Sequence, residues 1–95
     1  MSVDSMAKGS ATLLTGQSLT ITPSTSTEHY IIHNIIIPFG ATCEIYQTNG
    51  SSSTLIMTTS TSLLSYNLHA STTYYYTVKN IGTTSIFVSY NGVVA

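Results

Sequence analysis

Residues 28–38 read Glu28-His29-Tyr30-Ile31-Ile32-His33-Asn34-Ile35-Ile36-Ile37-Pro38 and form the densest apolar run in the chain. The run is rich in β-branched residues and lies between a Ser/Thr-rich loop and Pro38-Phe39-Gly40, so it predicts a strand rather than a helix. Side chains alternate along a strand. One face would carry His29, Ile31, His33, Ile35 and Ile37, and the other Tyr30, Ile32, Asn34 and Ile36. Because both faces are then apolar, we expect a second sheet or a neighbouring copy to cover the strand twice.

The chain carries very little charge. Of its 95 residues two are Lys or Arg and three are Asp or Glu, which leaves a formal net charge of -1, whereas roughly a quarter of the residues in ordinary soluble proteins are charged. Ser and Thr make up about a third of the chain, and 42% hydrophobic residues with seven Tyr indicate a folded protein rather than a disordered one. With little charge to keep copies apart, the composition favours self-association.

The same composition argues against several classes of partner. Lys8 and Lys79 are the only basic residues, so the chain offers no cationic track for nucleic acid and no patch for an anionic membrane surface. Cys43 is the single cysteine, which excludes an internal disulfide. No apolar run approaches the roughly 18 residues that a membrane span needs, and we see no signal peptide at the N-terminus.

Turn signals at intervals of roughly 8–12 residues divide the chain into about eight short strands. This spacing predicts an all-β fold, an antiparallel β-sandwich or jelly roll. We expect one domain over residues 10–95, preceded by a flexible or docking arm over residues 1–9. Asn91-Gly92 is interpreted as a last turn. The predicted strands besides the central one are 11–14, 18–22, 41–47, 54–59, 63–68, 73–79 and 85–90, of which 54–59 and 63–68 form either two strands or one bent strand.

The histidines are the only side chains that suggest a transition metal. His29 and His33 share a strand face but lie roughly 13 Å apart at about 3.3 Å per residue, too far to bind one ion together. Packing and hydrogen bonding is the simpler role for these two and for His69. The alternative is one histidine repeated around a symmetry axis. We therefore assign no metal ligand and no cofactor.

No catalytic set emerges from the nucleophiles and acids. Cys43 falls on the apolar side of its strand, where a cysteine behaves as a small hydrophobe. Nothing in the sequence places an acid beside a nucleophile and a base, whether Asp4, Glu28 or Glu44. We expect a protein that is not an enzyme.

The run Tyr74-Tyr75-Tyr76 has two interpretations. Aromatic rings on a β surface stack on sugars or anchor protein contacts. Alternatively, Tyr74 and Tyr76 fill the core and only Tyr75 faces outward, because tyrosine is common in strands for packing reasons.

Several segments resemble the small β-rich virion proteins of tailed bacteriophages, namely head decoration (cement) proteins and the compact modules of head or tail fibres. They are Ser18-Leu19-Thr20-Ile21-Thr22, Cys43-Glu44-Ile45-Tyr46 and Ser85-Ile86-Phe87-Val88-Ser89-Tyr90-Asn91-Gly92. The resemblance implies a homotrimeric β-sandwich on a capsid, often at three-fold positions, with a terminal arm gripping the shell. It carries over no functional residues.

The sequence thus leads to a first functional hypothesis, a non-enzymatic capsid decoration protein that assembles as a homo-oligomer, expected to be a trimer, on a larger particle. Its partners would be its own copies and the major capsid protein or another virion protein, and its location the virion after synthesis in the host cytoplasm. The alternative is a receptor- or carbohydrate-binding module of a phage fibre, using loops near Tyr75 and residues 49–53. The predicted oligomer interface contains Tyr30, Ile32, Ile36, Tyr75 and Phe87.

Overall fold

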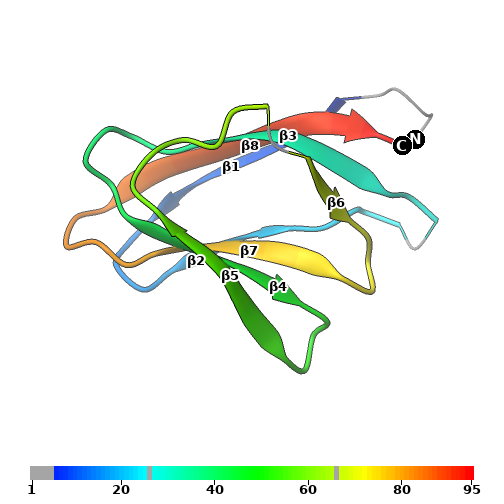
Figure 1. Ribbon diagram of the computed structural model, residues 1–95, viewed down its shortest axis with the longest axis horizontal. Helices are drawn as coiled ribbons and strands as arrows, with labels where there is room; N and C mark the ends of the chain where they lie inside the picture. Colours follow the sequence, from blue (N-terminus) through cyan, green and yellow to red (C-terminus); the bar gives the residue numbers. More distant parts are fainter. Residues whose placement is uncertain (1–5, 26, 66) are drawn as a thin grey trace.

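The computed structural model describes residues 6–25, 27–65 and 67–95, and in these ranges the regular structure consists of strands (Figure 1). Nowhere in them is there a helix with the length and apolar character needed to cross a bilayer. The eight strands are β1 (Met6–Leu13), β2 (Ser18–Ile21), β3 (Tyr30–Ile36), β4 (Cys43–Thr48), β5 (Ser53–Thr59), β6 (Leu68–Ala70), β7 (Tyr75–Asn80) and β8 (Ile86–Val94).

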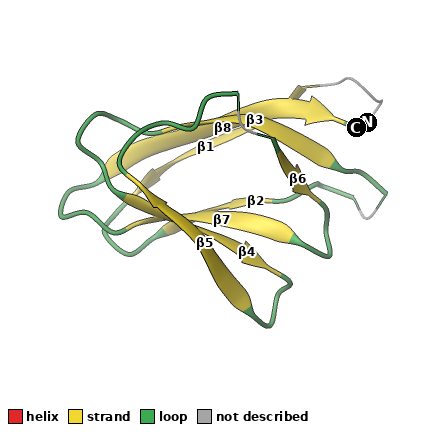
Figure 2. Ribbon diagram, viewed as in Figure 1, coloured by secondary structure: helices red, strands yellow, loops and turns green. Residues whose placement is uncertain are grey.

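The strands form two four-stranded antiparallel sheets that pack face to face (Figure 2). The first sheet has the order β1-β8-β3-β6 and the second the order β2-β7-β4-β5. Strand pairs nest from the ends of the chain inward, because β1 pairs with β8, β2 with β7, β3 with β6 and β4 with β5. This nesting is the topology of a jelly roll. The predicted fold class is therefore confirmed.

The core lies between the sheets and is filled by alternate residues of the strands. In β7 and β8 the alternation is strict: Tyr76 and Val78 face inward from one, and Ile86, Val88 and Tyr90 from the other. Each of these side chains removes an apolar surface from water and contributes roughly 1.5–3 kcal/mol to folding. The largest fully buried side chains among the described residues are Ile21, Ile32, Ile35, Cys43, Ile45, Val78, Asn80, Val88 and Val94.

The central strand β3 does not present two apolar faces, because its register against β8 shifts between Ile32 and Asn34. Ile32 pairs with Gly92 and Asn34 with Asn91, so His33 is the extra residue of a β-bulge. The bulge reverses the alternation. Tyr30 and Ile32 before it and Ile35 and Ile37 after it all face the same core. The expected division of these four side chains between two opposite faces is therefore wrong.

Gly92 lies within β8, opposite the bulge, and the predicted turn at Asn91-Gly92 is not formed. β8 continues to Val94 because β1 pairs with one of its edges and β3 with the other. A Cβ atom built on Gly92 would overlap the carbonyl oxygen of Ile31 and lie 2.8 Å from the Cα of Ile32. Glycine is needed here for the close approach of two backbones and not for a turn.

Predicted and observed strand limits differ most in two places. β1 begins at Met6, so residues 6–9 of the expected arm belong to a strand, while residues 1–5 lie outside the described residues. In the range predicted as a strand over residues 63–68, residues 63–65 and 67 lie in a loop and Leu68 begins the short β6, while residue 66 lies outside the described residues. Within that loop Leu63 and Ile35 exchange two backbone hydrogen bonds of 2.9 Å, which fasten the loop to the edge of β3.

We expect Gly92→Ala to destabilise the fold by about 3 kcal/mol or more, because the methyl group would meet backbone atoms that cannot move without breaking the pairing of β3 with β8. Urea denaturation followed by circular dichroism measures the change. Ser89→Ala, on the outer side of the same strand, is the control and should stay within about 0.5 kcal/mol of the natural chain. Equal stability of the Gly92 variant would contradict the close approach.

Candidate functional site

The connections β1–β2, β3–β4 and β7–β8 come together at one end of the sandwich, on the left of Figure 1. We refer to residues 14–17, 37–42 and 81–85 as the loop end. None of these residues is charged. Its polar side chains carry hydroxyl or amide groups, and several of its other side chains are large and apolar.

Asn80 is the buried polar group that organises the loop end. Its side chain is 0% exposed. The amide nitrogen donates to the carbonyl oxygens of Leu13, at 3.0 Å, and Thr84, at 2.9 Å, and the amide oxygen accepts from the backbone N–H of Gly82 at 2.9 Å. A buried amide is tolerated in a core when its hydrogen bonds are made, and these three join the end of β1 to both ends of the β7–β8 turn.

Backbone hydrogen bonds extend this network to all three connections. Asn80 accepts from the N–H of Gly16 at 2.7 Å and donates to the carbonyl of Gln17 at 2.9 Å. The hydroxyl of Thr15 donates to the carbonyl of Gly82 at 2.9 Å. The N–H of Ile81 donates to the carbonyl of Thr42 at 3.1 Å, which ties in the β3–β4 connection. The three connections are therefore held in fixed positions relative to one another.

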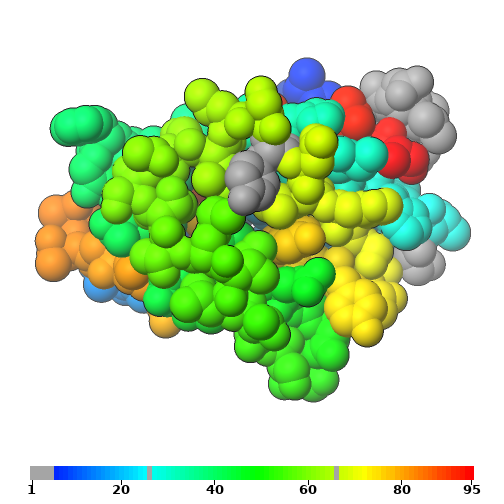
Figure 3. Space-filling view, viewed as in Figure 1, coloured from blue at the N-terminus to red at the C-terminus, as the bar shows by residue number. Residues whose placement is uncertain are grey.

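Each connection of the loop end carries one large apolar side chain that faces solvent. Leu14 is 57% exposed, Ile81 is 38% exposed and Phe39 is fully exposed. Phe39 occupies the second position of a tight turn in which the N–H of Ala41 donates to the carbonyl of Pro38 at 3.1 Å and Gly40 has a φ of 85°. These features define a type II turn. The connection projects from the upper left of Figure 3.

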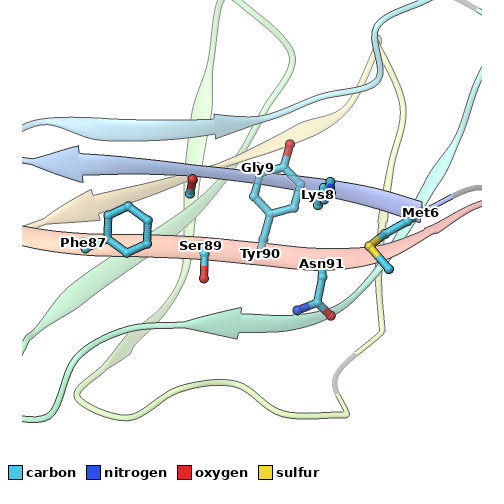
Figure 4. Close-up of a pocket in the computed structure, with 8 residues that line it drawn as sticks. Met6, Lys8, Gly9, Phe87, Ser89, Tyr90 and Asn91 are labelled. Carbon is cyan, nitrogen blue, oxygen red and sulfur yellow. The ribbon is translucent and has the colours of Figure 1, made fainter.

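The apolar surface continues from the loop end along the outer face of the first sheet. Ile36 and Phe87 are exposed there as diagonal neighbours, since Ile36 pairs with Ser89. Beyond them lies an open depression of about 580 Å³, with Phe87 and Met6 at its two ends and Lys8 along one side (Figure 4). The ring of Tyr90 crosses β1 at Gly9, where a Cβ atom would lie 2.7 Å from the ring. Burial raises the pKa of Tyr90.

The predicted interface residues do not form one patch. Tyr30 and Ile32 are buried in the chain's own core, so their placement on an intermolecular surface is wrong; the bulge in β3 turns them inward together with Ile35. Ile36 and Phe87 are exposed beside the loop end. Tyr75 is half-buried on the second sheet, paired with Thr48 far from the loop end.

Cys43 and Glu44, considered from the sequence as nucleophile and acid, lie on opposite faces of β4, and Asp4 lies outside the described residues. Cys43 is fully buried, and burial raises the pKa of its thiol, so the thiol stays protonated. Glu44 accepts a hydrogen bond of 2.6 Å from the hydroxyl of Tyr46, and this bond raises the pKa of Tyr46. Within the described ranges, no three His, Cys, Asp or Glu side chains are close enough together to hold a metal ion. His29 and His69 nevertheless come into contact across β3 and β6.

The tyrosine run follows neither interpretation fully. Tyr76 is in the core, Tyr75 faces outward from β7, and Tyr74 precedes the strand and is 54% exposed. Tyr74 borders a small depression of about 90 Å³ together with Gln47, Thr48, Asn49, Ser52 and Thr54. That volume is far below the roughly 300 Å³ at which ligand pockets begin, so this is at most an edge for a sugar ring to rest on.

Sequence reasoning missed the loop end because Leu14, Phe39 and Ile81 are separated by at least 25 residues, and only the jelly-roll topology brings their connections to the same end of the sandwich. One local signal was present. An aromatic residue between Pro38 and Gly40 stands at the tip of a turn, where its ring has no strand neighbour to pack on. Asn80 falls just after the strand predicted over residues 73–79, so nothing in the local pattern indicates its burial.

A scan against models of protein families and a search of the curated proteins found no match to this chain. The resemblance to bacteriophage virion proteins therefore remains an expectation, and the geometry of the loop end has to support any proposal of function.

We expect Asn80→Ala to destabilise the protein by about 2–4 kcal/mol, because it leaves the Gly82 N–H and two carbonyl oxygens without their partner. The measurement is urea denaturation, with amide hydrogen exchange of residues 81–85 as a second readout. The exchange of these amides should accelerate more than that of β4. Thr83→Ala, an exposed change in the same turn, should alter neither quantity; unchanged exchange in the Asn80 variant would contradict the role of Asn80.

Proposed function

We propose that this protein is a non-enzymatic structural protein of a virion, a capsid decoration protein that assembles as a homo-oligomer and docks on the shell through its loop end. The single observation that supports this proposal is the loop end itself: three exposed apolar side chains, from three connections, fixed by Asn80 on a surface without charge. Apolar side chains gathered on one exposed surface mark the contact surfaces of proteins, and we infer such a surface at the loop end.

The rigidity of the loop end supports docking on a protein rather than on a small ligand. Binding costs less conformational entropy when the contacting side chains are already in place, and the hydrogen bonds around Asn80 provide that preorganisation. An exposed phenyl ring at a turn tip fits the pattern of an interface anchor that enters a pocket of its partner. Many copies on a repeating lattice would add avidity to each single contact.

Self-association has separate support from β5, the outer strand of the second sheet. Its seven residues contain no proline and no charged side chain, and Leu55 and Ile56 are exposed at 47% and 40%. The strand lies across the lower middle of the face in Figure 3. Proteins protect long edge strands with charges or proline, and an edge without them offers backbone groups for pairing with another chain.

A receptor- or carbohydrate-binding module is the second candidate. Its support is the exposed ring of Tyr74 beside the polar turn over residues 49–52, at the end of the sandwich opposite to the loop end. The two candidates use opposite ends of the molecule, so variants at each end distinguish them.

We expect Phe39→Ser to weaken binding to capsids assembled without this protein by about thirtyfold, because loss of an anchoring ring costs about 2 kcal/mol. Co-sedimentation with such capsids measures the affinity. The fold should be unaffected, since the ring makes no contribution to the core.

Tyr74→Ala is the matched control for this experiment, because it removes an exposed ring at the other end. It should leave capsid binding within twofold. Capsid binding that is lost in the Tyr74 variant and kept in the Phe39 variant would refute docking through the loop end. Binding to a glycan array and not to capsids would favour the second candidate.

For the oligomer, we expect sedimentation velocity to show a multimer of the natural chain and a monomer of Leu55→Lys. A lysine on β5 would place an unpaired charge at the strand edge that pairs with another copy. Thr20→Lys, on the exposed side of the opposite edge strand β2, is the control and should remain multimeric. A monomeric natural chain at working concentration would contradict homo-oligomerisation.

A further inference from the structure

Three histidines gather on the outer side of the first sheet, at the edge formed by β3 and β6. His69 pairs with Ile31 across the two strands, and His29 stands two residues before Ile31 on the same side. His29, one residue before β3, is therefore a diagonal neighbour of His69 in β6, although the two are 40 residues apart in the sequence. Both side chains are exposed.

The facing ring nitrogens of this pair are already spaced like two ligands of one metal ion. His29 Nδ1 lies 3.1 Å from His69 Nε2. Two Zn–N bonds of about 2.0–2.1 Å at a tetrahedral angle separate their nitrogens by about 3.3 Å. The rings are tilted by 76° with their centroids 5.1 Å apart. They therefore do not stack on each other. An ion needs only a small outward movement of two exposed rings.

A metal ion can replace the hydrogen bond between the two rings without any change in the number of protons that the pair carries. A neutral imidazole carries one N–H, and without metal one ring donates it to the facing nitrogen of the other. An ion requires a lone pair on both facing nitrogens. The donor ring reaches that state by carrying its hydrogen on its other nitrogen, so the change of tautomer involves no net loss of a proton from the pair.

We propose that His29 and His69 form a binding site for a divalent transition metal ion such as Zn²⁺ or Ni²⁺. Imidazole nitrogens suit these ions, whereas Ca²⁺ and Mg²⁺ require oxygen ligands. The pair supplies two coordination positions. The other two are filled by water or by the same pair of a second copy, which would complete the four ligands of a structural zinc site. The metal site is independent of the docking function proposed for the loop end.

His33 provides a matched control within the same surface. It borders, with Ile31, Asn67 and His69, a depression of about 320 Å³. Its Nδ1 lies 3.0 Å from the amide oxygen of Asn67, which only accepts, so the ring donates from this nitrogen. His33 is thus a neighbouring surface histidine that is engaged with a different partner.

The test is isothermal titration of the full chain with zinc chloride, repeated with nickel chloride, at neutral pH. We expect binding to the natural chain, a loss of at least tenfold in affinity for His29→Ala and for His69→Ala, and a change within twofold for His33→Ala. Urea denaturation of each variant shows whether it is folded, and His29→Gln and His69→Gln replace any alanine variant that is not.

Stoichiometry identifies the source of the remaining ligands. One ion per chain without a change in sedimentation indicates water, and one ion per two chains with metal-dependent association indicates a second copy; both results support the pair as the ligand. No binding to the folded natural chain at millimolar metal would overturn the proposal. So would unchanged binding in the His29 and His69 variants, or an equal loss in the His33 variant.

Discussion

The extra residue that β3 inserts at His33 is the constraint on which the rest of the structure depends. Without it, Tyr30 and Ile32 would face one way and Ile35 and Ile37 the other, because side chains alternate along a regular strand. With it, all four enter a single core between the two sheets. β8 accommodates the bulge with Gly92, whose missing side chain lets the two backbones approach. A core of this size cannot lose two of these four side chains and remain folded.

A second constraint is polar and lies at the loop end. Asn80 is buried where apolar side chains fill the rest of the core, and its three side-chain hydrogen bonds replace the water that the chain ends of β1, β7 and β8 would otherwise need. The apolar side chains of the three connections are consequently presented outward from a rigid frame. The buried amide of Asn80 thus fixes the connections that carry the exposed apolar side chains. This arrangement is the basis of the docking function that we propose.

The surface differs from end to end and from sheet to sheet. The loop end and the adjoining outer face near Ile36 and Phe87 are apolar, the β5 edge lacks charge, and the opposite end carries Tyr74 beside a polar turn. Histidines occupy the β3–β6 edge. A chain with so few charged residues relies on geometry more than on electrostatic steering to choose its contacts, which is consistent with a protein that is held in a larger assembly.

Alternating apolar residues between turn signals determined the strands, their approximate limits and the sandwich class, because burial of one face imposes a period of two on the sequence. The burial of Cys43 followed from the same periodicity. Only the tertiary structure decided which faces met. The bulge at His33 is a backbone event without a distinct residue signature, and it reversed the expected exposure of Tyr30 and Ile32. The assembly of Leu14, Phe39 and Ile81, and the contact of His29 with His69, depend on strand order, which local sequence patterns do not encode.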